Sequence, residues 1–91
     1  MLPVGISTRR LNNLINELRS MGIWAERHSY SIRVMYRDKI VASLHLYPGF
    51  NTAVLRLYGD KQENDHVLLS VTRSISKHLP GFKIEVYILR H

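Results

Sequence analysis

Cysteine is absent from this chain of 91 residues. The absence excludes a disulfide framework, a thiolate metal site and a cysteine nucleophile. Histidine, the other common metal ligand, occurs five times. No two histidines have the i, i+3 or i, i+4 spacing that places two ligands on one helix face. The sequence therefore predicts neither a bound metal nor another cofactor.

Long apolar runs are also missing, and none approaches the roughly 20 residues that a membrane-spanning helix needs. The amino terminus, Met1-Leu2-Pro3-Val4-Gly5, lacks the basic start and apolar stretch of a signal peptide. We therefore expect a cytoplasmic protein without membrane contact. Apolar residues nevertheless recur throughout and make up 45% of the chain, which favours one compact domain over residues 1–91.

Motifs for nucleotide-dependent or hydrolytic chemistry are likewise absent. There is no Gly-rich phosphate loop, no nucleophile elbow and no pair of carboxylates in a distinctive setting. The chain has only seven acidic residues against thirteen lysines and arginines, for a net charge of +6. These features argue against an enzyme or a small-molecule substrate and favour an anionic partner, of which nucleic acid is the commonest.

Two segments have the apolar spacing of amphipathic helices. The first spans residues 8–21, where Ser7 or Thr8 can cap the amino end and Gly22 can end the helix in a left-handed conformation. The second follows Asp60 and Glu63, which have the spacing of a capping box, and stops before Pro80-Gly81.

Five segments alternate with a period of two and are predicted strands: residues 23–28, 31–37, 40–47, 53–58 and 82–89. The connection near Ser29 contains neither glycine nor proline. Residues 23–37 therefore form either a hairpin or one long strand bent by a bulge.

The predicted order is αββββαβ, an α+β fold with a single-layer, mainly antiparallel five-stranded sheet and both helices on one face. The pattern does not tell whether the fifth strand lies beside the first or the fourth. Alternation predicts the following side chains toward the helices: Ile32, Val34, Tyr36, Ile40, Ala42, Leu44, Leu46, Leu55, Leu57, Ile84, Val86 and Ile88. It predicts the following on the opposite face: Arg33, Met35, Arg37, Val41, Ser43, His45, Tyr47, Val54, Arg56, Tyr58, Glu85, Tyr87 and Leu89.

The face away from the helices combines cations with aromatic rings, which suits single-stranded nucleic acid or RNA. Arginine binds phosphate and stacks on bases, and tyrosine stacks on bases of any sequence. The predicted binding residues on this face are Arg33, Arg37, His45, Tyr47, Arg56, Tyr58 and Tyr87. Arg9 and Arg10, near a helix amino terminus, are further candidates for phosphate contact. The leading hypothesis is a small, basic, non-enzymatic nucleic-acid-binding protein that forms a homodimer.

Two other functions fit the same side chains. Tyrosine, methionine and arginine are enriched in protein interfaces, so the face can instead be buried in a homo- or hetero-oligomer. In the third hypothesis, His45 acts with Tyr47, Arg56 and Glu85 in a metal-independent ribonuclease.

One segment resembles a known group of proteins. The first predicted helix, Gly22-Ile23-Trp24 and the run Arg27-His28-Ser29-Tyr30 are similar to the opening of small double-stranded-RNA-binding-like folds, including mRNA-interfering toxins. Those toxins carry glycine before the strand histidine, whereas Arg27 precedes His28 here. The resemblance does not extend beyond this opening, and no family is assigned from it.

Overall fold

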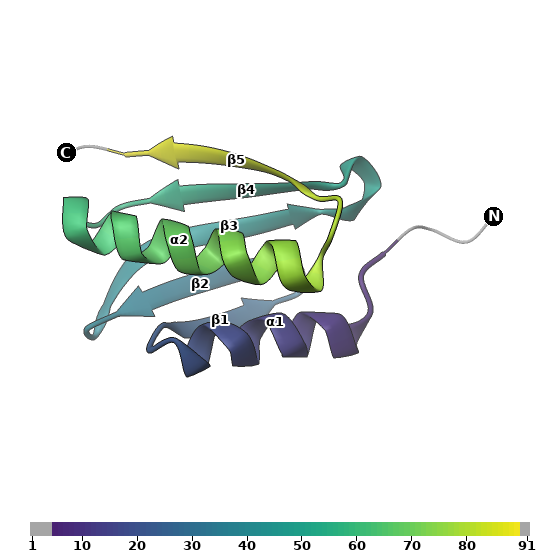
Figure 1. Cartoon of the computed structure of the whole chain (residues 1–91), viewed down its shortest axis with the longest axis horizontal. Coiled ribbons are helices and arrows are strands. Elements are labelled where there is room, and N and C mark those ends of the chain that lie inside the picture. Colours follow the sequence, from purple (N-terminus) through teal and green to yellow (C-terminus); the bar gives the residue numbers. More distant parts are fainter. Residues whose placement is uncertain (1–4, 90–91) are drawn as a thin grey trace.

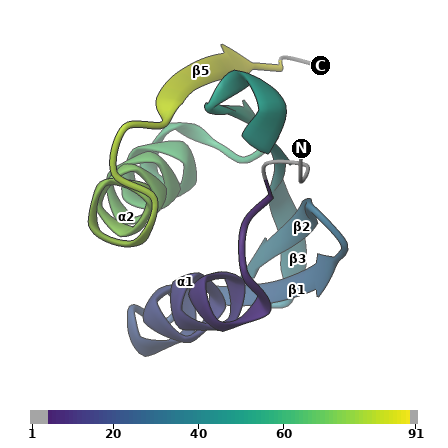
Figure 2. The same cartoon turned by 90° about the vertical axis from the view of Figure 1, so that its right-hand side faces the viewer.

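A computed structural model describes residues 5–89 and confirms the predicted α+β fold and element order (Figure 1). The elements are α1 (Thr8–Ser20), β1 (Trp24–His28), β2 (Ser31–Tyr36), β3 (Lys39–Tyr47), β4 (Thr52–Leu57), α2 (Lys61–His78) and β5 (Lys83–Ile88). Both helices lie on one side of the sheet, which curls around them (Figure 2). We call the other side of the sheet the open face. Within residues 5–89, no helix is long and apolar enough to cross a membrane.

The five strands lie side by side in chain order. Antiparallel pairing joins β1 to β2, β2 to β3 and β3 to β4, whereas β5 runs parallel to β4. A parallel neighbour requires a long crossover connection, which α2 supplies. The fifth strand therefore lies beside the fourth and not beside the first.

The helix ends follow the predicted local chemistry. Ser7 caps α1, because its hydroxyl accepts a hydrogen bond from the backbone amide of Arg10 at 3.2 Å. Asp60 and Glu63 form the predicted capping box at the start of α2. Gly22 has a φ of 81° just after α1, a left-handed conformation that suits glycine at a helix end.

The first two strand connections are tight turns. Residues 23–37 form a hairpin, since His28 pairs with Ser31 and Ser29 has a positive φ of 57°. The predicted strand 31–37 ends one residue early, because Arg37 and Asp38 take φ values of 53° and 64°. Positive φ at both positions is typical of a two-residue hairpin turn whose twist matches its strands.

A β-bulge between β2 and β3 changes which side chains reach the core. Val34 pairs with Ala42 but Met35 pairs with Ile40, which leaves Val41 as an extra residue in β3. Such an extra residue interrupts period-two alternation. Val41 and Ala42 are both completely buried, whereas Ile40 is 51% exposed. The predicted placement of Ile40 toward the helices and of Val41 on the open face is therefore wrong.

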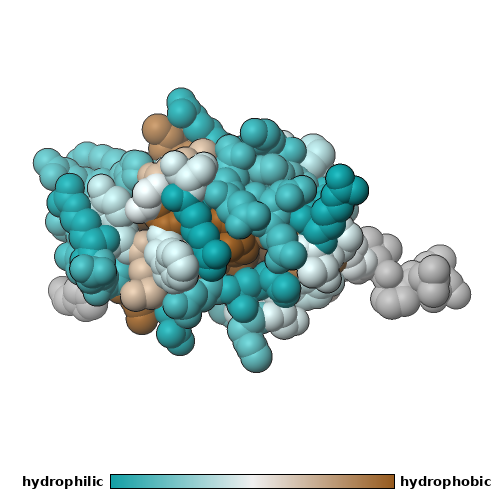
Figure 3. Space-filling view, turned by 90° about the horizontal axis from the view of Figure 1, so that it is seen from below, coloured by the Kyte–Doolittle hydropathy of each residue, from teal (hydrophilic) through white to brown (hydrophobic). Residues whose placement is uncertain are grey.

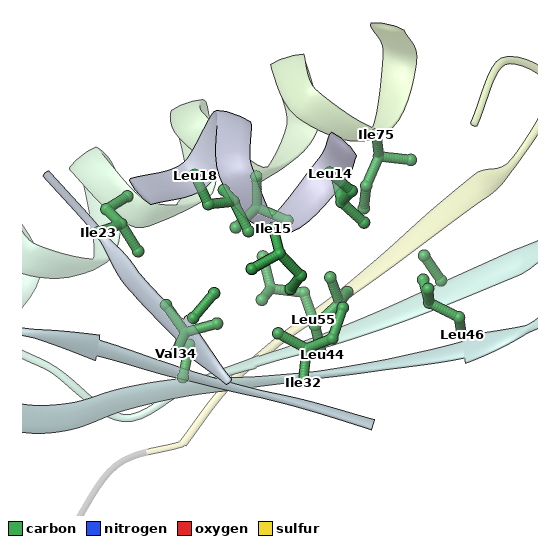
Figure 4. Close-up of a cluster of buried hydrophobic side chains, with 14 of the residues drawn as sticks. Leu14, Ile15, Leu18, Ile23, Ile32, Val34, Leu44, Leu46, Leu55 and Ile75 are labelled. Atoms are coloured by element: carbon green, nitrogen blue, oxygen red, sulfur yellow. The ribbon is translucent and has the colours of Figure 1, made fainter. Parts of the chain in front are cut away.

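The core fills the space between the two helices and the sheet (Figure 4). Its members come from α1, α2 and the strands, and include Leu14, Leu18, Ile32, Val34, Leu44, Leu55 and Ile75. Full burial of such a side chain stabilises the fold by about 1.5–3 kcal/mol. Val86 and Ile88 pair with core residues of β4, yet both remain exposed because β5 is the outermost strand. Both were predicted to point toward the helices, but neither is buried in the core.

Polar contacts tie the helices to each other and to the sheet. The Glu17 carboxylate on α1 accepts hydrogen bonds from Lys77 at 3.1 Å and from His78 at 3.2 Å, both on α2. Arg10 also donates to the backbone carbonyl of His78. On the sheet side, Lys39 lies 2.8 Å from the buried carboxylate of Glu63. Each contact joins segments far apart in the sequence.

Acidification is expected to lower the free energy of unfolding through two of these carboxylates. Hydrogen bonds from His78 and Lys77 hold the pKa of Glu17 below its ordinary value of 4.5. The Lys39 ammonium and the Asp60 amide do the same for the pKa of Glu63. A carboxylate with a lowered pKa stabilises the fold above its ordinary pKa, and that contribution is lost as the pH falls through the folded-state value.

Urea unfolding followed by circular dichroism between about pH 7 and pH 3 measures this loss. Glu63→Gln removes one titrating carboxylate and is expected to flatten the dependence of stability on pH below 4.5. Glu26→Gln, on an exposed residue of β1, serves as the control. Identical pH profiles for the wild type and Glu63→Gln would contradict the assignment.

Candidate nucleic-acid interface

The strand pairing aligns open-face side chains in rows that cross the sheet. One row contains Glu26, Arg33, Ser43, Arg56 and Tyr87, one residue from each strand in order. Directly opposed residues on neighbouring strands lie close enough for their side chains to interact. The row thus has two arginines on β2 and β4, a tyrosine at one end and a carboxylate at the other. We call it the arginine row.

A second row lies next to the arginine row and contains His28, Ser31, His45, Val54 and Glu85. The ring of His45 lies 6.3 Å from that of Tyr47, which is two residues further along β3, with 23° between the ring planes. Its Nδ1 atom is buried and has no hydrogen-bond partner within residues 5–89. This row therefore brings a histidine with an unused polar atom next to the arginine row.

A hollow of about 650 Å³ opens on this face between the two rows. Its walls are formed by Glu26, Arg27, His28, Ser31, Ile32, Arg33, Ile40, Ala42, Ser43, His45 and Tyr58. Three residues predicted from the sequence, Arg33, His45 and Tyr58, therefore meet at one site. The β-bulge adds Ile40 to it, which supplies an apolar wall.

Two side chains in the hollow are held in place and one is not. The hydroxyls of Ser43 and Tyr58 are 2.8 Å apart and share a hydrogen bond. No hydrogen bond or salt bridge within residues 5–89 engages the guanidinium of Arg33, which is exposed. The hollow thus combines a fixed pair of hydroxyls with a cation that has its donors available for a ligand.

Outside the hollow, Arg56 and Tyr87 form a second pair on the open face. The Arg56 guanidinium carbon lies 5.8 Å from the centre of the Tyr87 ring, within the range of a cation–π contact. Tyr87 is 49% exposed, so part of its side chain is accessible for stacking. Tyr47, the last residue of β3, is also exposed.

The remaining predicted residues lie elsewhere. Arg37 is in the turn between β2 and β3, with its guanidinium 5.1 Å from the ring of Tyr36. Arg9 and Arg10 are on α1, on the side of the sheet that the helices cover. The Arg10 guanidinium is already bound to the carbonyl of His78. These three arginines are not brought together with the hollow.

Sequence reasoning missed the contribution of β1. Trp24 was not among the predicted binding residues, but it is 49% exposed and its indole donates to Glu26 on the same face. The signal was present, because Ile23 and Ala25 are apolar and buried while their neighbours alternate to the other side. Applying the same alternation to residues 23–28 would have placed Trp24, Glu26 and His28 on the open face.

Metal ligands do not gather at this site. Within residues 5–89, no group of three or more histidine, aspartate or glutamate side chains is arranged to hold a metal ion. No protein family, curated protein or solved structure matches the chain.

Proposed function

We propose that this protein binds single-stranded nucleic acid on the open face of its sheet, without catalysing a reaction on it. The observation that carries the proposal is the hollow, where Arg33 has unused donors beside His45 and the Ser43–Tyr58 pair. The proposal includes residence in the cytoplasm, where nucleic acid is available as a partner.

Charge and shape support this class of ligand. The chain carries a net charge of +6, and the two arginines of the arginine row lie on β2 and β4, near the middle of the sheet. Glu26 and Glu85 lie on the edge strands, where they repel phosphates toward those central arginines. Exposed rings on a sheet surface bind unstacked bases, which single strands offer and duplexes do not.

The hollow has room for a nucleotide base, and its lining is partly apolar and partly polar. Its volume of about 650 Å³ lies within the usual range for small-ligand sites, and Ile40 gives it an apolar wall. The Ser43 and Tyr58 hydroxyls supply polar groups for a base edge, and the ring of His45 forms part of the wall. Arg33 lines the same hollow and would contact the phosphate of the bound nucleotide.

Fluorescence anisotropy with labelled single-stranded and duplex RNA and DNA tests the proposal. Single strands are expected to bind more tightly than duplexes. Arg33→Gln removes one phosphate contact and is expected to reduce the slope of log affinity against log salt by about 0.7. Tyr87→Ala is expected to weaken single-strand binding by about 1–3 kcal/mol through the loss of one stacked base.

Arg73→Gln is the matched control, because Arg73 is an exposed arginine on α2 and its loss changes the net charge equally. If Arg33→Gln and Arg73→Gln weaken binding to the same extent, the effect is one of net charge and the open-face site is wrong. The absence of any binding would leave the face to a protein partner. RNA cleavage in the presence of a chelator that disappears in His45→Ala would replace simple binding with a ribonuclease activity.

A further inference from the structure

The last strand, β5, forms an outer edge of the sheet with unused backbone groups (Figure 1). Its residues Lys83 and Leu89 donate backbone hydrogen bonds to Asn51 and Leu57, at and just beyond the two ends of its partner β4. Backbone groups alternate in direction along a strand, so the odd-numbered residues of β5 face β4. The amides and carbonyls of Ile84, Val86 and Ile88 therefore point away from the sheet.

The side chains along this edge are apolar and exposed on both faces of the strand. Val86 and Ile88 are 39% and 56% exposed on the helix side, while Tyr87 and Leu89 are 49% and 43% exposed on the open face. The only charges in β5, Lys83 and Glu85, have opposite sign. For a chain of net charge +6, this is a nearly neutral region where two copies can approach with little repulsion.

The opposite edge, β1, is protected against strand pairing. The Arg19 side chain reaches over from α1, donates to the carbonyl of Ala25 at 2.9 Å and lies 4.1 Å from the centre of the Trp24 ring. Charged side chains such as Glu26 and Arg27 occupy the strand itself. Seen from the α1 and β1 side, most of the surface around a central apolar area is hydrophilic (Figure 3). Charged residues and a covering side chain are common ways of blocking an edge.

We propose that β5 pairs in antiparallel fashion with β5 of a second copy of this chain, with the two-fold axis at Val86. In β5, odd-numbered side chains lie on the open face and even-numbered side chains on the helix side. The two open faces therefore lie on the same side of the dimer only if even-numbered residues pair with even-numbered ones and odd with odd. An axis at Glu85 is unfavourable, because it sets two carboxylates directly opposite each other. An axis at Val86 sets Val86 opposite Val86 and Ile84 opposite Ile88, and joins the outward backbone groups in about six hydrogen bonds.

This register also suits the open face, where Glu85 of one copy lies opposite Tyr87 of the other. Because β1 is blocked, a chain of copies joined β5 to β1 cannot grow, and the pairing closes as a two-fold dimer. The two five-stranded sheets then form one continuous sheet with both open faces on the same side. The dimer does not depend on the proposed nucleic-acid binding, and it is tested without nucleic acid.

Light scattering after size exclusion gives the mass in solution. The wild type is expected at twice the chain mass of 10.6 kDa. Val86→Lys, which puts two ammonium groups at the axis, is expected to give the monomer mass with an unchanged circular dichroism spectrum. Leu69→Lys makes the same change at an exposed leucine of α2 and is expected to remain a dimer. A monomeric wild type, or a dimeric Val86→Lys, overturns the proposal.

Because the chain lacks cysteine, single cysteine variants report the register directly. A hydrogen-bonded antiparallel pair has Cα atoms about 5.5 Å apart, within the range that a disulfide spans. Val86→Cys is therefore expected to form a disulfide-linked dimer on mild oxidation, and Leu69→Cys is not. Equal cross-linking of the two variants, or faster cross-linking of Glu85→Cys than of Val86→Cys, contradicts the register.

Discussion

Replacement of Val41 by lysine is expected to unfold the protein, whereas the same replacement at the preceding residue, Ile40, is expected to leave it folded. The bulge in β3 turns Val41 into the core, where its side chain is completely buried. An unpaired buried charge costs about 3–5 kcal/mol or more, and a domain of this size has a total stability of about 5–15 kcal/mol. Ile40 is 51% exposed, so lysine there is expected to change stability by no more than about 0.5 kcal/mol.

Urea unfolding followed by circular dichroism measures both variants against the wild type. The pair is a sensitive test of the bulge because regular alternation predicts the opposite result. A folded Val41→Lys together with an unfolded Ile40→Lys would show that β3 pairs with β2 without an extra residue.

Replacement of Leu44 by alanine is expected to lower the free energy of unfolding by about 2–5 kcal/mol. Leu44 is completely buried on the central strand β3, between Ile32 of β2 and Leu55 of β4. All three belong to the core cluster, so truncation of Leu44 leaves a cavity in its middle. The backbone on both sides is fixed by strand pairing and has little freedom to collapse into it.

The same measurement on Leu69→Ala is the matched control. Leu69 is 51% exposed on α2, and its truncation is expected to change the free energy of unfolding by about 0.5 kcal/mol or less. Similar losses in the two variants would mean that the sheet is not packed around Leu44 in the way described.

Local chemistry explains why most of the fold could be predicted from the sequence. The Asp60–Glu63 capping box and the glycine after α1 depend on residues within one helical turn, and both were predicted. The bulge at Val41 depends on how β3 aligns with β2, which no local pattern records. The exposure of Val86 and Ile88 likewise depends on β5 being an edge strand, a consequence of the crossover through α2.

The candidate site was also predicted only in part, because strand alternation can be read from the sequence but contacts between distant segments cannot. Alternation placed Arg33, His45 and Tyr58 on one face, and the structure brings them to one hollow. Arg37 was assigned to a strand but lies in a turn with a positive φ, where the alternation of side chains along a strand no longer applies. Arg10 was considered for phosphate contact on the basis of the helix amino terminus, but a carbonyl of α2 already engages it. Its partner is distant in sequence and so could not be foreseen.

The parallel pairing of β5 with β4 has a consequence for the order in which the chain folds. The antiparallel pairs from β1 to β4 join neighbours in sequence through short turns, so little chain entropy is lost when each contact forms. The last strand pairs with β4 across the 18 residues of α2, so its contacts close a longer loop and cost more chain entropy. We therefore expect β5 to dock late in folding and to detach first. A second copy paired with β5 would add hydrogen bonds to the strand that is expected to detach first, and would thereby raise the free energy needed to detach it.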